Sequence, residues 1–145
     1  MGKRKGFIAI VLFLVMLAVI TVAFILAKQA EAPTIALNQF ITVTSPLADA
    51  SITSPVRVAG TVRAGWTAFE GQVGTVLVRD ENGTELGTGI LAATSDWLRS
   101  PVSFEVLVSF SAPAGEEGTL EFESENPSGD PARVQTFTLP VRFER

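Results

Sequence analysis

The chain of 145 residues contains no cysteine, no histidine and no tyrosine. Without cysteine it cannot form a disulfide, a thiolate metal site or a thiol nucleophile. Without histidine it lacks the commonest general base and the commonest transition-metal ligand of proteins. Together these absences exclude Ser–His–Asp and Cys–His catalysis. We therefore expect no metal, no cofactor and no enzyme of these classes.

Lysine is missing from most of the chain, because the last one is Lys28. This excludes a Ser–Lys catalytic dyad beyond that point. From Glu31 onward the chain has seven arginines and fifteen acidic residues, a net side-chain charge of −8 (7 − 15). A surface this acidic repels phosphate backbones, so we expect no nucleic-acid partner.

An uninterrupted apolar run of 21 residues occupies positions 7–27. As a helix it would rise about 31 Å, close to the roughly 30 Å thickness of a bilayer's hydrocarbon core. We therefore predict a single transmembrane helix at residues 7–27. The run is longer than the apolar core of a signal peptide, which is usually about 7–15 residues. The small-x-small sequence at 30–32 has the form of a cleavage site, but Pro33 would directly follow the cut and disfavours it. We favour an uncleaved signal anchor over a cleaved signal.

Basic residues flank this run unevenly. Lys3, Arg4 and Lys5 precede it, whereas only Lys28 follows it closely. The positive-inside rule then predicts a cytoplasmic basic tail at residues 1–6 and an extracytoplasmic C-terminal part. We expect a single-pass protein of the cell membrane, with a stalk at residues 28–39 and one domain at residues 40–145.

The predicted domain shows apolar and polar residues in alternation, interrupted by Gly, Pro, Asn and Ser, which is typical of short β-strands. Asn82-Gly83 is a strong hairpin signal, and Pro140 should lie at a bulge or an edge because it cannot donate to a ladder. Strands with one apolar face predict an all-β fold, an immunoglobulin-like antiparallel β-sandwich of about seven strands. The seven expected strands are residues 41–44, 56–63, 73–79, 85–92, 102–110, 120–125 and 136–144.

Several short motifs in a fixed order resemble the immunoglobulin-like domain family of bacterial spore germination proteins. The resemblance covers residues 41–143. It implies a β-sandwich of the bacterial cell envelope with no known catalytic activity. The motifs are Ile41-Thr-Val-Thr-Ser-Pro46, Ile52-Thr-Ser-Pro-Val56, Val58-Ala-Gly-Thr61, Phe69-Glu-Gly71, Val78-Arg-Asp80 before Asn82-Gly83, and Leu139-Pro-Val-Arg142.

Trp66, Glu70 and Trp97 are the candidate contact residues for a ligand or partner. Trp66 and Trp97 follow turn-like sequences and could form a platform for sugar rings or peptide side chains, although Trp also fills cores when its N–H finds a partner. Glu70 could be a binding carboxylate. Alternatively it could accept N–H bonds within its loop, with Phe69 in the core and Gly71 giving the turn.

The oxygen-bearing side chains of Asp80, Asn82 and Glu85 lie close together in the sequence and could suggest a calcium-binding site. The chain lacks the full EF-hand spacing, and a hairpin turn explains these residues. We therefore predict no metal site there.

These observations predict a non-catalytic, membrane-anchored binding or interaction module of the bacterial cell envelope. Its expected partners are the membrane that it spans and either an envelope protein or a cell-wall polymer. A structural subunit of an envelope or germination-type membrane complex is the alternative. A carbohydrate-active enzyme using two carboxylates is less well supported, because the fifteen scattered acidic residues single out no pair.

Overall fold

The computed structural model describes Met16 and residues 36–144 of the chain. The chain divides into two compact units, residues 1–32 and 33–145, and the fold described here belongs to the second. The predicted basic tail, the transmembrane helix except Met16, and stalk residues 28–35 lie outside the described residues. Among the described residues, no helix is long and apolar enough to cross a bilayer.

Residues 36–144 fold into β-strands joined by turns and loops, with one short 3₁₀ helix and no α-helix in that range. All seven predicted strands are present. Two further strands of two residues each were not predicted. The elements are β1 (Ala36–Leu37), β2 (Ile41–Ser45), β3 (Ser51–Ile52), β4 (Val56–Val62), β5 (Gln72–Asp80), β6 (Glu85–Ala93), β7 (Val102–Val108), β8 (Glu117–Ser124), η1 (Pro131–Arg133) and β9 (Thr136–Phe143).

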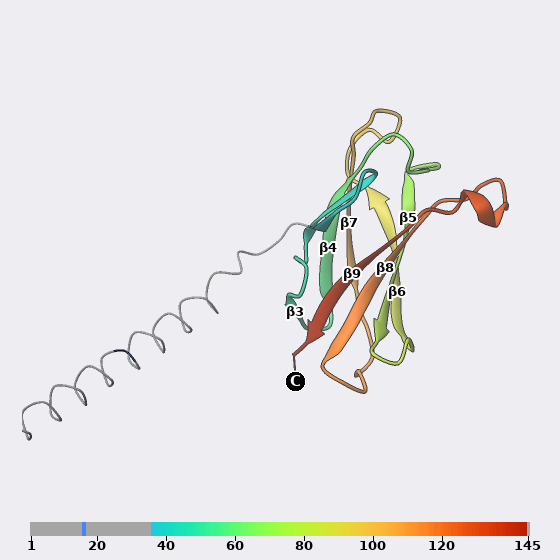
Figure 1. The fold of residues 1–145 in the computed structure, drawn as a ribbon. Helices are drawn as coiled ribbons and strands as arrows, with labels where there is room; N and C mark the ends of the chain where they lie inside the picture. Colours follow the sequence, from blue (N-terminus) through green and yellow to red (C-terminus); the bar gives the residue numbers. More distant parts are fainter. Residues whose placement is uncertain (1–15, 17–35, 145) are drawn as a thin grey trace, which may run out of the picture. The chain divides into compact units, whose positions relative to one another are not determined.

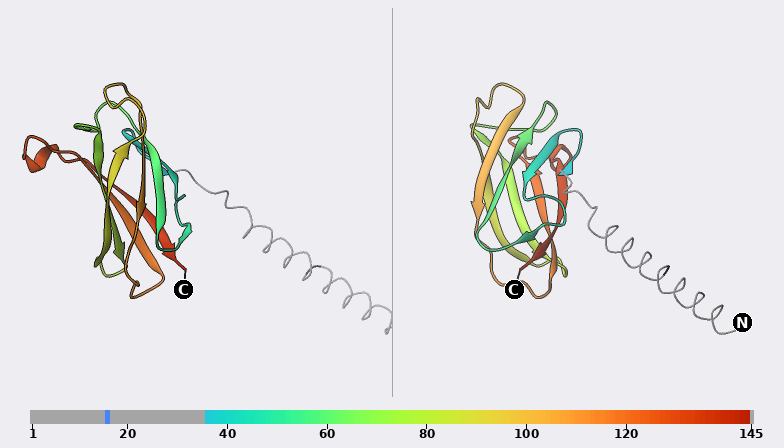
Figure 2. Two further views of the ribbon diagram at one scale, coloured as in Figure 1. Left: turned by 180° about the vertical axis from the view of Figure 1, so that it is seen from behind. Right: turned by 90° about the vertical axis from the view of Figure 1, so that its left-hand side faces the viewer.

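The strands form one curled sheet in the order β1-β2-β4-β7-β6-β5-β8-β9-β3. Neighbouring strands are antiparallel except for β3 and β9, which are parallel. β6 and β7 share only two register pairs, Ala92↔Glu105 and Ala93↔Phe104. The sheet turns at this narrow junction, so that its β1-β2-β4-β7 half faces its β6-β5-β8-β9-β3 half (Figure 1). The views from behind and from the side show the same arrangement (Figure 2).

The apolar faces of the two halves meet in a single core. Phe104 of β7 and Phe122 of β8 contact each other across it, with ring centroids 6.4 Å apart. The alternation seen in the sequence is therefore the alternation between core and surface, as in the buried–intermediate pattern of β8. Other fully buried members of the core are Ile41, Val43, Val58, Val73, Val76, Val78, Leu91, Leu120 and Leu139.

The predicted hairpin between β5 and β6 is confirmed. The buried carboxylate of Asp80 accepts hydrogen bonds from the backbone N–H groups of Asn82 and Thr84, both at 2.9 Å. Gly83 N–H donates to the Asp80 carbonyl at 2.9 Å, and Gly83 has a φ of +79°. Only Gly83, and not Asn82, adopts positive φ. The Asp80 oxygen thus stabilises the turn.

The backbone nitrogen of Pro140 in β9 faces away from the neighbouring strand β8, as the prediction from its missing N–H requires. Its register partner in β8 is Thr119. The N–H groups two and four residues later, of Arg142 and Glu144, donate away from β8 to the short β3 segment. By the same alternation the nitrogen of Pro140 points away from β8, where no ladder bond is lost.

A bidentate ion pair joins Arg57 of β4 to Glu105 of β7 on the outer face of the sheet. Arg57 Nε and Nη2 donate to the two carboxylate oxygens at 2.8 and 2.7 Å. These hydrogen bonds, together with the charge of Arg57, lower the pKa of Glu105 from its ordinary value. Both side chains remain largely exposed to solvent, so solvent screening limits what the pair adds to stability.

Replacing Arg57 should therefore release Glu105. In Arg57→Met the pKa of Glu105 is expected to rise toward its ordinary value, because both the hydrogen bonds and the neighbouring positive charge are lost. Carboxyl-carbon NMR titration measures this. Arg99→Met is the matched control, because Arg99 pairs with Asp96 instead. An unchanged Glu105 titration in Arg57→Met contradicts the assignment.

Gly74 occupies the most crowded glycine position of the sheet. It lies in β5 between β6 and β8 and has a φ of +149°. A Cβ atom there would lie 2.0 Å from the carbonyl oxygen of Glu123. Gly74→Ala should lower the free energy of unfolding of residues 33–145 by at least about 3 kcal/mol, from the clash and the unfavourable φ together.

The control for this prediction is Gly129→Ala. Gly129 has a φ of +70°, but a Cβ there would have nothing within 4 Å. It should lose only about 1 kcal/mol, the cost of the conformation itself. Denaturant unfolding of both variants measures the difference, and equal losses would show that packing against β8 is not what requires Gly74.

Candidate functional site

Three loops gather at one end of the domain, because β4, β6 and β8 end there and β5, β7 and β9 begin there. They are residues 63–71, 94–101 and 125–135. The first two lie together at the top of Figure 1. The Ala64 N–H donates to the Ser100 hydroxyl at 3.0 Å, which joins them directly. All three predicted contact residues belong to these two loops.

Trp66 belongs to the core. It is 6% exposed, and its ring N–H donates to the Val73 carbonyl at 2.8 Å. This is the arrangement of a core-filling tryptophan whose polar atom has found a partner. Its indole therefore offers little surface to a ligand.

Glu70 lies at the tip of a tight hairpin. Phe69 and Gln72 exchange both backbone hydrogen bonds, at 2.8 and 2.9 Å. Between them Glu70 and Gly71 have φ values of +50° and +82°. Two consecutive residues of positive φ are the signature of a type I′ turn. Gly71 thus gives the turn as predicted, whereas Glu70 adopts a conformation that residues with a Cβ disfavour.

The alternative in which Glu70 accepts N–H bonds within its loop while Phe69 lies in the core is wrong on both of these points. Phe69 is 45% exposed and does not lie in the core. The Glu70 carboxylate makes no hydrogen bond or ion pair within the part of the chain that the structure describes. Because the two-residue turn is closed by backbone bonds alone, it needs no side-chain acceptor. A contact role for Glu70 stays a prediction.

Trp97 and Leu98 form the tip of the second loop. Trp97 is half-buried against the core, and its ring lies beside the hairpin turn, 4.0 Å from where a Cβ on Gly71 would be. Leu98 is 74% exposed. Asp96 shapes this turn, since its carboxylate accepts the Leu98 N–H at 3.1 Å and its carbonyl accepts the Arg99 N–H at 3.1 Å.

Trp97 and Leu98 on one loop and Phe69 on the loop joined to it are the large apolar side chains that this end leaves exposed or half-exposed, and we call these three residues the apolar tip. Sequence reasoning identified Trp97 but missed Phe69 and Leu98 as exposed residues. A signal existed for Leu98, because the turn-forming Ser95-Asp96 sequence directly before Trp97 indicates a loop at this point of the chain. A shallow hollow of about 280 Å³ lies beside the tip, lined by Val62, Arg63, Ala64, Trp66, Ala68, Trp97, Leu98, Ser100 and Val102.

Charges around the apolar tip are balanced. Arg99 pairs with Asp96 at 3.3 Å. Arg63, which lines the hollow, makes no ion pair among the described residues, and Glu70 lies on the neighbouring hairpin. The tip is therefore apolar and locally close to neutral, within a domain that is strongly acidic as a whole.

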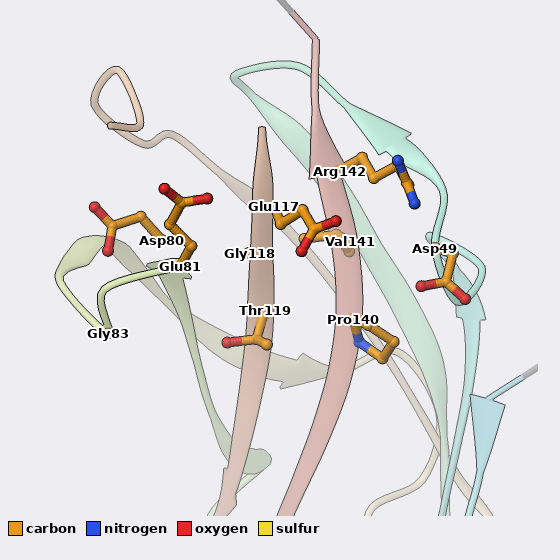
Figure 3. Close-up of a pocket in the computed structure, with 10 residues that line it drawn as sticks. All are labelled: Asp49, Asp80, Glu81, Gly83, Glu117, Gly118, Thr119, Pro140, Val141 and Arg142. Carbon is orange, nitrogen blue, oxygen red and sulfur yellow. The ribbon is translucent and has the colours of Figure 1, made fainter. Parts of the chain in front are cut away.

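The opposite end of the domain carries that acidity. A hollow of about 500 Å³ lies over β8 and β9 there. Figure 3 shows Asp80 and Glu81 on one side of it and Asp49 on the other, with Glu117 between them. Arg142 is the one basic residue of its lining. The two ends thus differ sharply: one is apolar and near neutral, the other acidic.

Comparison with known proteins identifies a family. Residues 40–130 match the family model described as the immunoglobulin-like domain of bacterial spore germination, which covers more than half of the chain. Neither the curated proteins nor the solved structures include a match to the chain.

The positive φ of Glu70 leads to a stability prediction. Glu70→Asn should raise the free energy of unfolding of residues 33–145 by about 0.5–1 kcal/mol, because asparagine adopts the left-handed conformation more easily than glutamate. Chemical denaturation measures the change. Glu81→Asn is the control, because Glu81 is an exposed turn residue without positive φ. A loss of stability in Glu70→Asn would mean that the Glu70 side chain supports the loop.

Proposed function

The chain belongs to the family of immunoglobulin-like domains of bacterial spore germination, and on that basis we propose that it is a non-catalytic binding module of the bacterial cell envelope. In this proposal residues 7–27 anchor it in the cell membrane, with the N-terminus in the cytoplasm. An immunoglobulin-like β-sandwich then lies outside. The length of the apolar run and the basic residues before it support the anchor and its direction.

The apolar tip is the observation that carries the binding role. Between residues 38 and 144 four large apolar side chains are exposed, and two of them, Phe69 and Leu98, belong to the two joined loops that also carry Trp97. Single exposed apolar residues are ordinary, whereas apolar side chains gathered on one surface mark interaction sites. Loops held on a rigid β-scaffold are also where binding residues usually lie.

The residue inventory supports a non-catalytic role. The chain has neither cysteine nor histidine, so the nucleophile and base pairs of common hydrolases cannot form. Next to the apolar tip, the acidic side chains Glu70 and Asp96 differ in role: Asp96 holds its own turn, and Glu70 lies on the exterior of the hairpin. The tip offers surface for contact without a pair of convergent reactive groups.

Three envelope components could occupy this surface: an envelope protein, a cell-wall polymer or membrane lipid. A photo-reactive amino acid placed at position 98 of the full chain tests the proposal in native membranes. We expect cross-linked products from position 98, because a bound component would cover the tip. Mass analysis of the adducts identifies the component.

Position 107 is the matched control. Leu107 is 63% exposed, close to the 74% of Leu98, but it lies in β7 away from the apolar tip. The same probe there should give few adducts. Equal yields at the two positions would mean that exposure alone causes cross-linking, and the proposed contact surface would be wrong.

A further inference from the structure

We propose that the turn between β5 and β6 carries a site of spontaneous chemical modification, the Asn82-Gly83 bond, and that the folded turn keeps this bond unreactive. The reaction is the deamidation of Asn82 to aspartate and isoaspartate, with water as the co-reactant. Asp80, whose side chain holds the turn, is the residue that suppresses it. This chemistry belongs to residues 79–84 alone and does not depend on the proposed function.

The reaction needs a backbone nitrogen that is free to move. The nitrogen of Gly83 gives up its proton to hydroxide and attacks the side-chain carbonyl carbon of Asn82, Cγ. A new N–C bond forms, and the bond from Cγ to the amide nitrogen breaks as ammonia leaves with a proton taken from water. Water then adds to either carbonyl of the resulting succinimide ring and opens it, which leaves aspartate or isoaspartate at position 82.

The group that is attacked is accessible. Asn82 is exposed, and its side-chain amide makes no hydrogen bond within the part of the chain that the structure describes. Gly83 follows it directly, and the nitrogen of a glycine is the least hindered because no Cβ stands beside it. The two groups that the reaction joins are therefore neighbours on the surface.

The other two asparagines of the chain lack this combination. Asn126 is followed by Pro127, whose nitrogen has no hydrogen to lose. The side-chain oxygen of Asn38 accepts the N–H groups of Phe40 and Ile41, at 2.7 and 2.8 Å, so its amide is held. Asn82 is thus the asparagine at which we expect the reaction.

The attacking group, in contrast, is restrained by the fold. The Gly83 N–H donates to the Asp80 carbonyl at 2.9 Å, and the Gly83 carbonyl accepts a hydrogen bond from Arg79 Nη1 at 3.2 Å. Gly83 is therefore fixed through both its N–H and its carbonyl group. Its nitrogen cannot turn toward Asn82 Cγ until the bond to Asp80 is broken.

The Asp80 side chain closes the turn around the reactive bond. Its Oδ1 accepts the N–H groups of Asn82 and Thr84, each at 2.9 Å, and these lie on either side of that bond. The Asp80 N–H donates to the Thr84 carbonyl at 3.0 Å. Asp80 is only 6% exposed, so water competes little for these bonds. The turn can open only if Asp80 releases the N–H groups that it holds.

Deamidation would alter the acidic end of the domain. It adds a negative charge beside the hollow that Asp80, Glu81 and Glu117 line (Figure 3). Isoaspartate also adds a methylene group to the backbone of the turn, because the chain then runs through Cβ. The N–H groups of Asn82 and Thr84 would no longer stand at the spacing that Asp80 Oδ1 bridges, so the connection between β5 and β6 would be weakened.

Incubation of the full chain in detergent at mildly alkaline pH tests the proposal. Peptide mapping by mass spectrometry, with detection of isoaspartate, measures the modified fraction at each asparagine in native buffer and in denaturant. We expect Asn82 to react at least about tenfold more slowly in the folded chain, the effect of a turn held closed by about 1.4 kcal/mol. Asn38 and Asn126 are internal controls and should react far more slowly than Asn82 in denaturant.

Two substitutions of Asp80 test its role. Asp80→Ala removes the acceptor of two N–H groups and should raise the rate in the folded chain about tenfold. Asp80→Asn keeps an acceptor oxygen at the same place and should stay closer to the original rate. Val62→Ala, a core substitution at the other end of the domain, should lower stability without raising the rate.

Several outcomes would overturn the proposal: equal rates in the folded and the denatured chain, equal rates in Asp80→Asn and Asp80→Ala, or a rise in Val62→Ala as large as in Asp80→Ala. The last would show that global unfolding, and not the turn, exposes the bond. If Asp80→Ala does not fold, hydrogen exchange of the original chain decides. The Gly83 amide should then be protected, and an unprotected Gly83 amide overturns the proposal as well.

Discussion

The fold depends on one constraint: a single sheet has to bury its own apolar face. The long strands present most of their apolar side chains on one side, and no α-helix between residues 36 and 144 is available to cover them. The sheet therefore curls at the two register pairs that join β6 to β7, and its halves close over a shared core. Burial of apolar area is the main favourable term in folding, so the loops at either end are held by this closure.

Much of the fold could be predicted because period-two alternation directly encodes which side of a strand faces the core. This is why strands such as Val102–Val108 were found from the sequence. The two-residue strands Ala36–Leu37 and Ser51–Ile52 were missed because two residues contain no alternation. Their pairing is set by the strands next to them. The start of β8 was placed three residues late, because Glu117-Gly118-Thr119 has no apolar side chain to mark it.

The candidate site was only partly predictable. Trp66 and Trp97 were predicted as contact residues because each is a tryptophan that follows a turn-like sequence. These two features do not distinguish a buried ring from a ring on the surface. The difference arises from the Val73 carbonyl, which accepts the Trp66 N–H and is seven residues away in the chain. Phe69 was expected in the core because phenylalanine usually lies there. It is exposed instead, next to a type I′ turn whose positive φ at Glu70 no local preference of glutamate indicates.

The shortness of β1 and β3 has a consequence for proteins that share a crowded surface. These two strands are the outermost members of the sheet, and each has only two residues. A long unpaired edge strand lets one copy extend the sheet of another and start fibril growth, whereas a very short edge strand offers an incoming strand too few backbone hydrogen bonds for stable pairing. The part of β9 that β3 leaves uncovered contains Pro140, which cannot donate to an added strand, so copies that meet along this side would separate rather than join.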